Sequence, residues 1–140
     1  MLIDALMCLA LNVYFEARNQ SLEGQLAVAQ VVVNRTIDDR YPDTPCKVVY
    51  DARTYSSGFP KRHQCQFSWY CDGKSDDPTD KAAFEKAMHI TIYLMKSDVS
   101  DITNGATHYH TRHILPSWAK GQEPTAKIGD HVFYRLESRY

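Results

Sequence analysis

The sequence has almost no net charge and no long apolar run. Its 16 lysines and arginines nearly balance 17 aspartates and glutamates, which leaves −1 with histidine neutral. So weak a field argues against nucleic acid or an acidic membrane as a partner. No window reaches the ~18 apolar residues of a membrane helix, so we expect no membrane insertion. The length of 140 residues predicts one domain, residues 1–140, which we expect to be a monomer.

A Cys-x-x-Cys pair is also missing, which argues against a structural zinc ribbon. Of the four cysteines, Cys8 lies in an apolar stretch and is predicted to be a core thiol. Cys46, Cys65 and Cys71 could form one disulfide and leave one thiol, with three pairings open. The N-terminal stretch contains Asp4, no lysine or arginine and no cleavage-like site, so it is interpreted as a buried helix rather than a secretory signal.

Three long helices are predicted from apolar residues that recur at steps of three and four. The first covers 2–18, and its stripe is Leu2, Leu6, Leu9 and Val13, widened by Ile3 and Ala10. The second covers 22–35 after Ser21 as N-cap and is apolar nearly all round, which indicates a central buried helix. The third covers 80–96 after Thr79 as N-cap. Its inner stripe is Phe84, Ala87, Met88, Thr91, Leu94 and Met95.

The remaining segments contain turn-forming residues. Proline and glycine punctuate 41–78 between aromatics, which predicts loops with short strands. Residues 99–127 are irregular, and alternation in 128–136 predicts a strand. The chain is therefore expected to be a mostly helical α+β domain with an aromatic-rich loop region and little β structure.

Glu16 is the sharpest candidate for chemistry. Three residues beyond Val13, it extends the apolar stripe of the first helix near that helix's C-terminal end. Apolar surroundings and the negative end of the helix dipole both raise the pKa of a carboxyl group. A glutamic acid that stays protonated near neutral pH is what a general acid requires. The alternative is that Glu16 turns to solvent or pairs with Arg18 or Arg35.

Four blocks of sequence carry a family resemblance. They are NVYFEAR at 12–18 with EGQLAVAQVVVNR at 23–35, CQFSW at 65–69 with CDG at 71–73, GATHYH at 105–110, and PSWA at 116–119 with IGDHVFY at 128–134. In this order they resemble the SleB/CwlJ-type cell wall hydrolases, which are the spore cortex-lytic enzymes and their bacterial and phage relatives.

The resemblance implies a lysozyme-like fold and cleavage of the peptidoglycan glycan strand between N-acetylmuramic acid and N-acetylglucosamine. It maps the catalytic acid onto Glu16, in agreement with the stripe. It also implies lytic transglycosylase chemistry, in which one carboxyl group protonates the leaving oxygen and the muramoyl 6-hydroxyl closes onto C1 as a 1,6-anhydro end. Muramidase-type hydrolysis at the same bond is the alternative. We expect no cofactor.

Aromatic and polar side chains in the two loop blocks are the candidate sugar platform, because rings stack on sugars while polar groups bind their hydroxyls. The proposed substrate-binding residues are Tyr14, Ser68, Trp69, Thr107, Tyr109 and His110. If 107–110 is extended, Thr107 and Tyr109 share one face and His108 and His110 the other. Trp118 is expected in the core.

A second carboxylate near Glu16 and a metal site are the alternatives to a site with one catalytic carboxyl group. Glu23, Asp72 and Asp130 could approach Glu16, but we expect Glu23 to support the start of the second helix and Asp72 to form an Asx turn. His108, His110 and His113 could ligate a metal, and the loop also offers His63, Cys65 and Cys71. The corresponding alternative function is a metal-dependent cell wall amidase or peptidase that acts through His108 and His110. We expect no metal, and histidines that form hydrogen bonds at a cleft rim.

A secretion signal and a separate wall-binding domain, which spore enzymes of this family usually carry, are not found in the sequence. A catalytic domain alone resembles a phage endolysin, made in the host cytoplasm and acting on the wall from the periplasm. A bacterial enzyme without its signal is the alternative. The cysteines fit an oxidising compartment.

Overall fold

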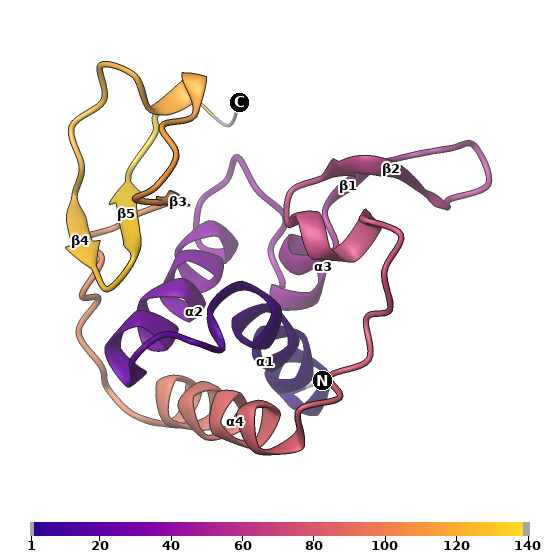
Figure 1. Ribbon diagram of the computed structural model, residues 1–140, viewed down its shortest axis with the longest axis horizontal. Coiled ribbons are helices and arrows are strands. Elements are labelled where there is room, and N and C mark those ends of the chain that lie inside the picture. Colours follow the sequence, from indigo (N-terminus) through magenta and orange to yellow (C-terminus); the bar gives the residue numbers. More distant parts are fainter. Residues whose placement is uncertain (1, 139–140) are drawn as a thin grey trace.

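Four helices form the body of the molecule (Figure 1). The computed structural model describes residues 2–138. Helix α1 (Leu2–Ala17) lies at the centre and packs against α2 (Leu22–Thr36), α3 (Pro45–Val49) and α4 (Lys81–Lys96). No helix within residues 2–138 is long and apolar enough to cross a membrane.

The long helices begin where side chains cap them. Ser21 accepts a hydrogen bond from the Gly24 amide at 3.2 Å, which confirms it as the N-cap of α2. At α4 the expected N-cap, Thr79, is wrong by one residue. Asp80 accepts from the Ala83 amide at 3.1 Å, because the carboxylate reaches the third amide of the helix from that position.

Burial agrees with the apolar stripes except at helix ends. Leu6, Leu9, Ala10 and Val13 of α1 are buried, and α2 is a central buried helix as predicted. Three stripe positions were wrong, because they occupy terminal turns outside the core; the exposed fractions are 53% for Leu2, 70% for Ile3 and 37% for Met95.

Residues 41–78 contain more regular structure than predicted. The short strands are confirmed as an antiparallel hairpin of β1 (Ala52–Thr54) and β2 (Pro60–Cys65), followed by the 3-10 helix η1 (Ser68–Cys71). Helix α3 was missed, although Thr44 caps it by accepting from the Lys47 amide and Pro45 starts its first turn.

A three-stranded antiparallel sheet covers the other side of α2 (Figure 1). Its order is β3 (His108–Thr111), β5 (His131–Tyr134) and β4 (Ala126–Ile128), with η2 (Ser117–Ala119) in the β3–β4 connection. The strand expected over 128–136 is confirmed as β5, but it is shorter than predicted, because Ile128 belongs to β4. Gly129, with a φ of 58°, turns the chain between β4 and β5, a conformation that glycine adopts without steric cost.

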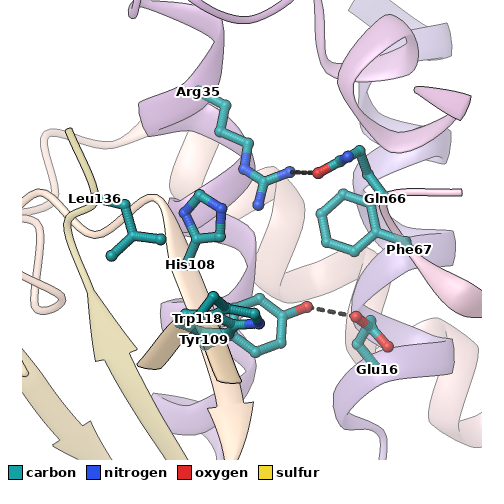
Figure 2. A pocket seen from close by; sticks show the side chains of 8 residues that line it. All are labelled: Glu16, Arg35, Gln66, Phe67, His108, Tyr109, Trp118 and Leu136. Atoms are coloured by element: carbon teal, nitrogen blue, oxygen red, sulfur yellow. Dashed lines mark hydrogen bonds between the residues drawn. The ribbon is translucent and has the colours of Figure 1, made fainter. Parts of the chain in front are cut away.

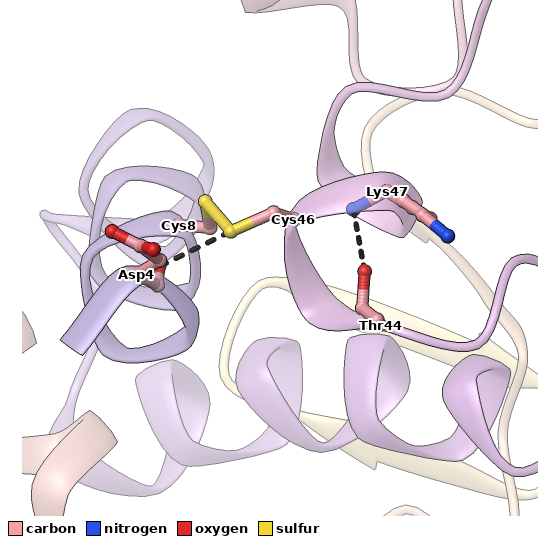
Figure 3. The surroundings of a disulfide bond; sticks show 5 residues. All are labelled: Asp4, Cys8, Thr44, Cys46 and Lys47. Carbon is pink, nitrogen blue, oxygen red and sulfur yellow. Dashed lines mark hydrogen bonds between the residues drawn. A yellow bond between two sulfur atoms is a disulfide. The ribbon is translucent and has the colours of Figure 1, made fainter. Parts of the chain in front are cut away.

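All four cysteines are paired. Cys8 on α1 is bonded to Cys46 on α3, across a sequence separation of 38 residues (Figure 3). Cys65 at the end of β2 is bonded to Cys71 in η1. The predictions of a free core thiol at Cys8 and of one remaining thiol are therefore wrong, because α3 packs on α1 and brings Cys46 to Cys8.

Candidate active site

Glu16 lies in the last turn of α1, between the helical body and the three-stranded sheet. Its Oε1 accepts a hydrogen bond of 2.6 Å from the hydroxyl of Tyr109 on β3. Figure 2 shows the Tyr109 side chain directed from β3 toward Glu16. A carboxyl group at the end of a buried helix is thus held by a residue 93 positions away in the sequence.

One cavity of about 240 Å³ opens on the sheet side of Glu16. Four parts of the chain line it: α1, α2, the segment before η1, and the sheet region with η2. The lining residues are Glu16, Arg35, Gln66, Phe67, His108, Tyr109, Trp118 and Leu136. Its walls are largely aromatic, with polar groups from Arg35 and Gln66, as in sites that bind small organic ligands.

A second hollow of about 440 Å³ also includes Glu16. Its lining is mostly polar and comes from α1 and the segment from η1 to α4. The lining residues are Tyr14, Phe15, Glu16, Arg18, Ser68, Trp69, Asp72, Lys74, Ser75, Asp77 and Thr79. Glu16 therefore lines both hollows.

Burial raises the pKa of the Glu16 carboxyl group above its ordinary value. The Tyr109 hydrogen bond and the positive charge of Arg35 oppose this rise. The guanidinium of Arg18 lies over the Tyr14 ring, 4.7 Å from its centroid. Of the two arginines expected as partners of Glu16, Arg35 is the one whose charge lowers the pKa of the glutamate.

Arg35 is buried at the end of α2 and is held by several groups. Its Nε donates to the Thr107 carbonyl oxygen at 2.8 Å, and its Nη1 donates to Gln66 Oε1 at 3.4 Å (Figure 2). Its guanidinium lies 5.0 Å and 5.3 Å from the ring centroids of Tyr41 and Phe67. Arg35 was expected from the sequence only as an alternative partner of Glu16, and Gln66 was not expected at the site; a charged residue at the end of an apolar helix was the signal for Arg35.

Tyr109 is held in its protonated form. Burial and the adjacent Glu16 raise the pKa of the Tyr109 hydroxyl well above its usual range. The edge of the His131 ring packs on Tyr109 with centroids 5.1 Å apart, and burial lowers the pKa of His131. The tyrosine hydroxyl is therefore a neutral hydrogen-bond donor to Glu16.

The residues proposed on α1 and η1 occupy different depths. Ser68 is exposed and lines the second hollow. Trp69 is 5% exposed, stacks on Phe15 with centroids 4.8 Å apart, and lines the same hollow. Tyr14 is fully buried, and its hydroxyl accepts from the Asp80 amide at 3.0 Å.

Of the three residues expected in the sheet region, Tyr109 lines the cavity, and Thr107 and His110 do not. Thr107 is buried and accepts from the Leu136 amide, while His110 stacks on Tyr134 and has contacts at both ring nitrogens. His108 and Trp118 line the cavity instead. Trp118, which was expected in the core, is half-buried: it packs against the core residues Tyr134 and Leu136, and its ring also lies against His108 in the cavity, with centroids 5.4 Å apart.

The other carboxylates have local roles. Glu23 lies in the first turn of α2, and Asp130 accepts from Gln20 and pairs with Arg112. Asp72 accepts from the Lys74 amide at 2.9 Å, which confirms the Asx turn, and it also lines the second hollow.

The metal alternative loses two of its candidate ligands, because Cys65 and Cys71 are disulfide-bonded. Residues 2–138 contain no cluster of three histidine, cysteine or acidic side chains that could hold a metal ion.

Known proteins resemble the chain over most of its length. The family model for Cell Wall Hydrolase matches residues 19–134. The spore cortex-lytic enzyme of Oceanobacillus iheyensis is 38% identical over 129 residues, which cover 86% of this chain and 38% of that protein. The spore cortex-lytic enzyme of Halalkalibacterium halodurans is 26% identical and is covered for 33% of its length. The chain thus spans about a third of the length of these relatives.

Two solved structures share the fold. The catalytic domain of the Bacillus cereus SleB protein is 21% identical with a TM-score of 0.63, over 95% of this chain and 91% of that one. The catalytic domain of the germination-specific lytic transglycosylase SleB from Bacillus anthracis is 23% identical with a TM-score of 0.67, over 94% and 93%. These likenesses confirm the α+β fold class. Together with the match of the family model, they confirm the resemblance seen in the sequence: the chain belongs to the cell wall hydrolase family, with the fold of the SleB catalytic domains.

Proposed function

We propose that this chain cleaves the glycan strand of peptidoglycan between N-acetylmuramic acid and N-acetylglucosamine, with Glu16 as the general acid and then the base. The observation that carries the proposal is the half-buried Glu16 carboxyl group, which has a raised pKa and lies between two hollows. A polymer that fills both hollows passes the Glu16 carboxyl group, which can then reach a bond in the interior of the polymer chain.

In the first step, protonated Glu16 donates its proton to the glycosidic oxygen while the bond from that oxygen to C1 of the muramoyl residue breaks. In the second, the Glu16 carboxylate removes the proton of the muramoyl 6-hydroxyl as its oxygen bonds to C1. The product is a 1,6-anhydro end, and Glu16 regains its proton. One carboxyl group serves both steps, unlike the paired acids of most glycosidases.

The neighbours of Glu16 suit both states of the acid. Tyr109 donates to Oε1, so the other carboxylate oxygen is left for the proton that moves. Arg35 favours the carboxylate that forms after proton transfer, because its positive charge lowers the pKa of Glu16. Burial favours the protonated state before it.

We propose that the sugar binds along aromatic and polar groups on both sides of Glu16. Ser68 and Tyr109 are proposed to contact the sugar, and the Trp69 ring is proposed to lie beside it at the edge of the second hollow. We propose that Tyr14, Thr107 and His110 support the residues that form this surface. His108 and Trp118 are added, because they line the cavity.

The setting and the extent of the protein belong to the proposal as well. Both curated relatives are named spore cortex-lytic enzymes, which favours the spore cortex over the phage endolysin that we expected from the sequence. Two disulfides fit action outside a reducing compartment. We propose that residues 1–140 form one catalytic domain that acts as a monomer.

The test is mass spectrometry of the fragments released from purified cell wall by the wild type and by Glu16→Gln. We expect 1,6-anhydro-muramoyl ends from the wild type and no soluble fragments from the variant. Glu23→Gln, an exposed glutamate of α2, is the matched control and should act like the wild type. Reducing ends in the released fragments would mean that the chain hydrolyses the glycosidic bond and is not a transglycosylase. Free peptide stems, or full activity of Glu16→Gln, would overturn the proposal.

A further inference from the structure

Gln20 joins the turn between α1 and α2 to the turn between β4 and β5. Its Nε2 donates to Oδ2 of Asp130 at 3.1 Å, and its Oε1 accepts from the Asp130 backbone amide at 3.0 Å. Both ends of the side-chain amide are therefore bonded to one residue, which lies 110 positions away in the sequence. Two hydrogen bonds to a single partner fix the orientation of the contact as well as its length.

Two glycines leave the space that the Gln20 side chain occupies. A Cβ atom at Gly129 would lie 2.5 Å from Gln20 Oε1, and a Cβ atom at Gly24 would lie 2.9 Å from Gln20 Cβ. A side chain at either position would therefore displace Gln20 from its place. The backbones of α2 and of the β4–β5 turn approach Gln20 closely because glycine has no Cβ atom.

The backbone of Gln20 is held from the helical side. Its amide donates to the Ala17 carbonyl oxygen at 2.9 Å. Its carbonyl oxygen accepts from Nε2 of Gln25, a buried residue of α2, at 3.3 Å. Ala17 directly follows Glu16 in the last turn of α1, so one turn of backbone ties the position of Gln20 to that of Glu16.

The Asp130 side of the contact leads to Tyr109. The Arg112 amide, just beyond the end of β3, donates to the Asp130 carbonyl oxygen at 2.8 Å. At the opposite end of the strand, the Thr107 carbonyl oxygen accepts from Arg35 Nε at 2.8 Å. Tyr109 lies between these two points on β3. The strand that carries the donor to Glu16 is therefore linked to both ends of α2.

We propose that Gln20 is a positioning residue, which through Asp130 holds β3 where the Tyr109 hydroxyl donates to Glu16. The two oxygens of that bond are 2.6 Å apart, and a hydrogen bond weakens steeply as its distance and angle depart from the optimum. A small displacement of the strand therefore changes the environment of the acid. The inference rests on the proposed function in one respect only, namely that Glu16 is the acid that acts on substrate.

Apolar packing between the sheet and α2 does not replace this contact. Phe133 and Ala106 belong to one buried cluster with Val28 of α2. Apolar attraction has no direction, so it opposes separation of the sheet from the helix more than a small tilt of the sheet. Hydrogen bonds depend on direction, and those of Gln20 and Arg35 restrain the tilt from both ends.

The titration of Glu16 reports this geometry, and other ionisable groups act on it too. On the cavity side they are Arg35, His108 and Tyr109, and His131 packs on Tyr109. The second hollow adds Arg18, Asp72, Lys74 and Asp77. Beside the Gln20 contact are Arg112 and His113, which act on Asp130. Substitutions of Gln20 alone leave all of these in place.

The experiment is a carbon-13 NMR titration of the Glu16 side-chain carboxyl in the folded protein without substrate. Gln20→Ala removes both hydrogen bonds to Asp130 and so weakens the Tyr109 bond, which favours the Glu16 carboxylate. We expect the midpoint of Glu16 to rise by about half a unit, the equivalent of a modest hydrogen bond. In a Tyr109→Phe background, Gln20→Ala should produce no further shift. Gln64→Ala, at an exposed position of β2, is the matched control and should leave the midpoint unchanged.

An exchange of the two partners separates positioning from a general loss of stability. In Gln20→Glu two carboxylates face each other, so the midpoint should rise as far as in Gln20→Ala or further. When Asp130→Asn is added, amide and carboxylate have changed places and both hydrogen bonds can form again. The midpoint should then return to that of Asp130→Asn alone, which accounts for the lost charge. The same variants in the Tyr109→Phe background measure the direct effect of the moved charge.

Hydrogen exchange of the Asp130 amide checks the contact itself, because this amide donates to Gln20 Oε1. Its exchange should accelerate in Gln20→Ala and slow again in the double variant.

Faster exchange at Asp130 with an unchanged Glu16 midpoint would overturn the inference, and so would unchanged exchange. A shift that persists without the Tyr109 hydroxyl, or one that the double variant does not reverse, would also contradict it. If Gln20→Ala does not fold, the comparison of Gln20→Glu with the double variant decides. The titration needs no substrate, so a failure to cleave glycan would contradict the proposed function and leave this result intact.

Discussion

The Tyr109 hydroxyl and Glu16 Oε1 are 2.6 Å apart, and this hydrogen bond joins β3 to the last turn of α1. The contact places a neutral donor against a carboxyl group whose pKa is raised by burial. The bond strengthens when Glu16 is ionised, because a charged acceptor binds a donor more tightly than a neutral one. Burial and this hydrogen bond therefore shift the pKa of Glu16 in opposite directions.

Tyr109→Phe should make Glu16 a weaker acid. The variant loses the hydrogen bond that lowers the pKa of Glu16, so the upper pH limit of activity should move to higher pH. Loss of a hydrogen bond to a charged group should reduce kcat/KM about 10- to 100-fold. Tyr93→Phe, at an exposed position of α4, is the control and should leave both unchanged. A fall in kcat/KM with an unshifted pH profile would contradict this account.

Glu16→Gln should stabilise the protein at neutral pH. The folded pKa of Glu16 lies above its unfolded value, so folding retains the proton and the ionised carboxylate destabilises the fold as pH rises through this interval. The free energy of unfolding should exceed that of wild type by about 1.4 kcal/mol per unit of raised pKa. Urea denaturation at pH 7 and at pH 4 measures the difference, which should shrink at the acidic pH. An equal difference at both values would show that ionisation is not its cause.

The two disulfides should contribute unequally to stability. In the chain-entropy account, a loop of 38 residues is worth about 4 kcal/mol and one of 6 residues about 2 kcal/mol. Replacing Cys8 and Cys46 by alanine should therefore lower the free energy of unfolding more than replacing Cys65 and Cys71. Thermal denaturation of both double variants, with the wild type under reducing conditions, is the measurement. The reverse order would mean that local packing outweighs loop closure.

Trp118→Ala should weaken substrate binding more than it affects chemistry. The ring lines the cavity beside Glu16 and packs on His108, so its loss removes a stacking surface for sugar. We expect KM for soluble glycan fragments to rise about 3- to 10-fold with a smaller change in kcat. Tyr93→Ala removes an exposed ring on α4 and should change neither constant. A large loss of kcat alone would place Trp118 in the chemical step instead.

Local patterns account for the parts that were predicted correctly. The helical stripe continues from Leu6 through Val13 to Glu16, and every step depends only on the 3.6-residue period. The N-cap at Ser21 is local in the same way, because its partner Gly24 is three residues away. The strand predicted over 128–136 is present but begins later, at His131, because Gly129 with its left-handed φ reverses the chain before it.

Contacts between distant segments account for what was missed. Arg35 meets Gln66 across 31 positions, Trp69 meets Asn12 across 57, and Cys46 meets Cys8 across 38. No spacing in the sequence encodes these pairs. They form because α1 packs against α2 and α3, and because η1 closes over the end of α1 through the Phe15–Trp69 stack.

The sequence by itself determined the three long helices and the place of Glu16 on a buried face, because each depends on residues that are near one another in the chain. It also determined the family, because each of the four blocks is a short local motif. Only the tertiary structure decided what surrounds Glu16. Its donor Tyr109, the charge of Arg35 and the linings of the two hollows come from elements far apart in sequence. The reason is physical: the pKa of an acid and the direction of its hydrogen bonds depend on the groups that lie around it in space.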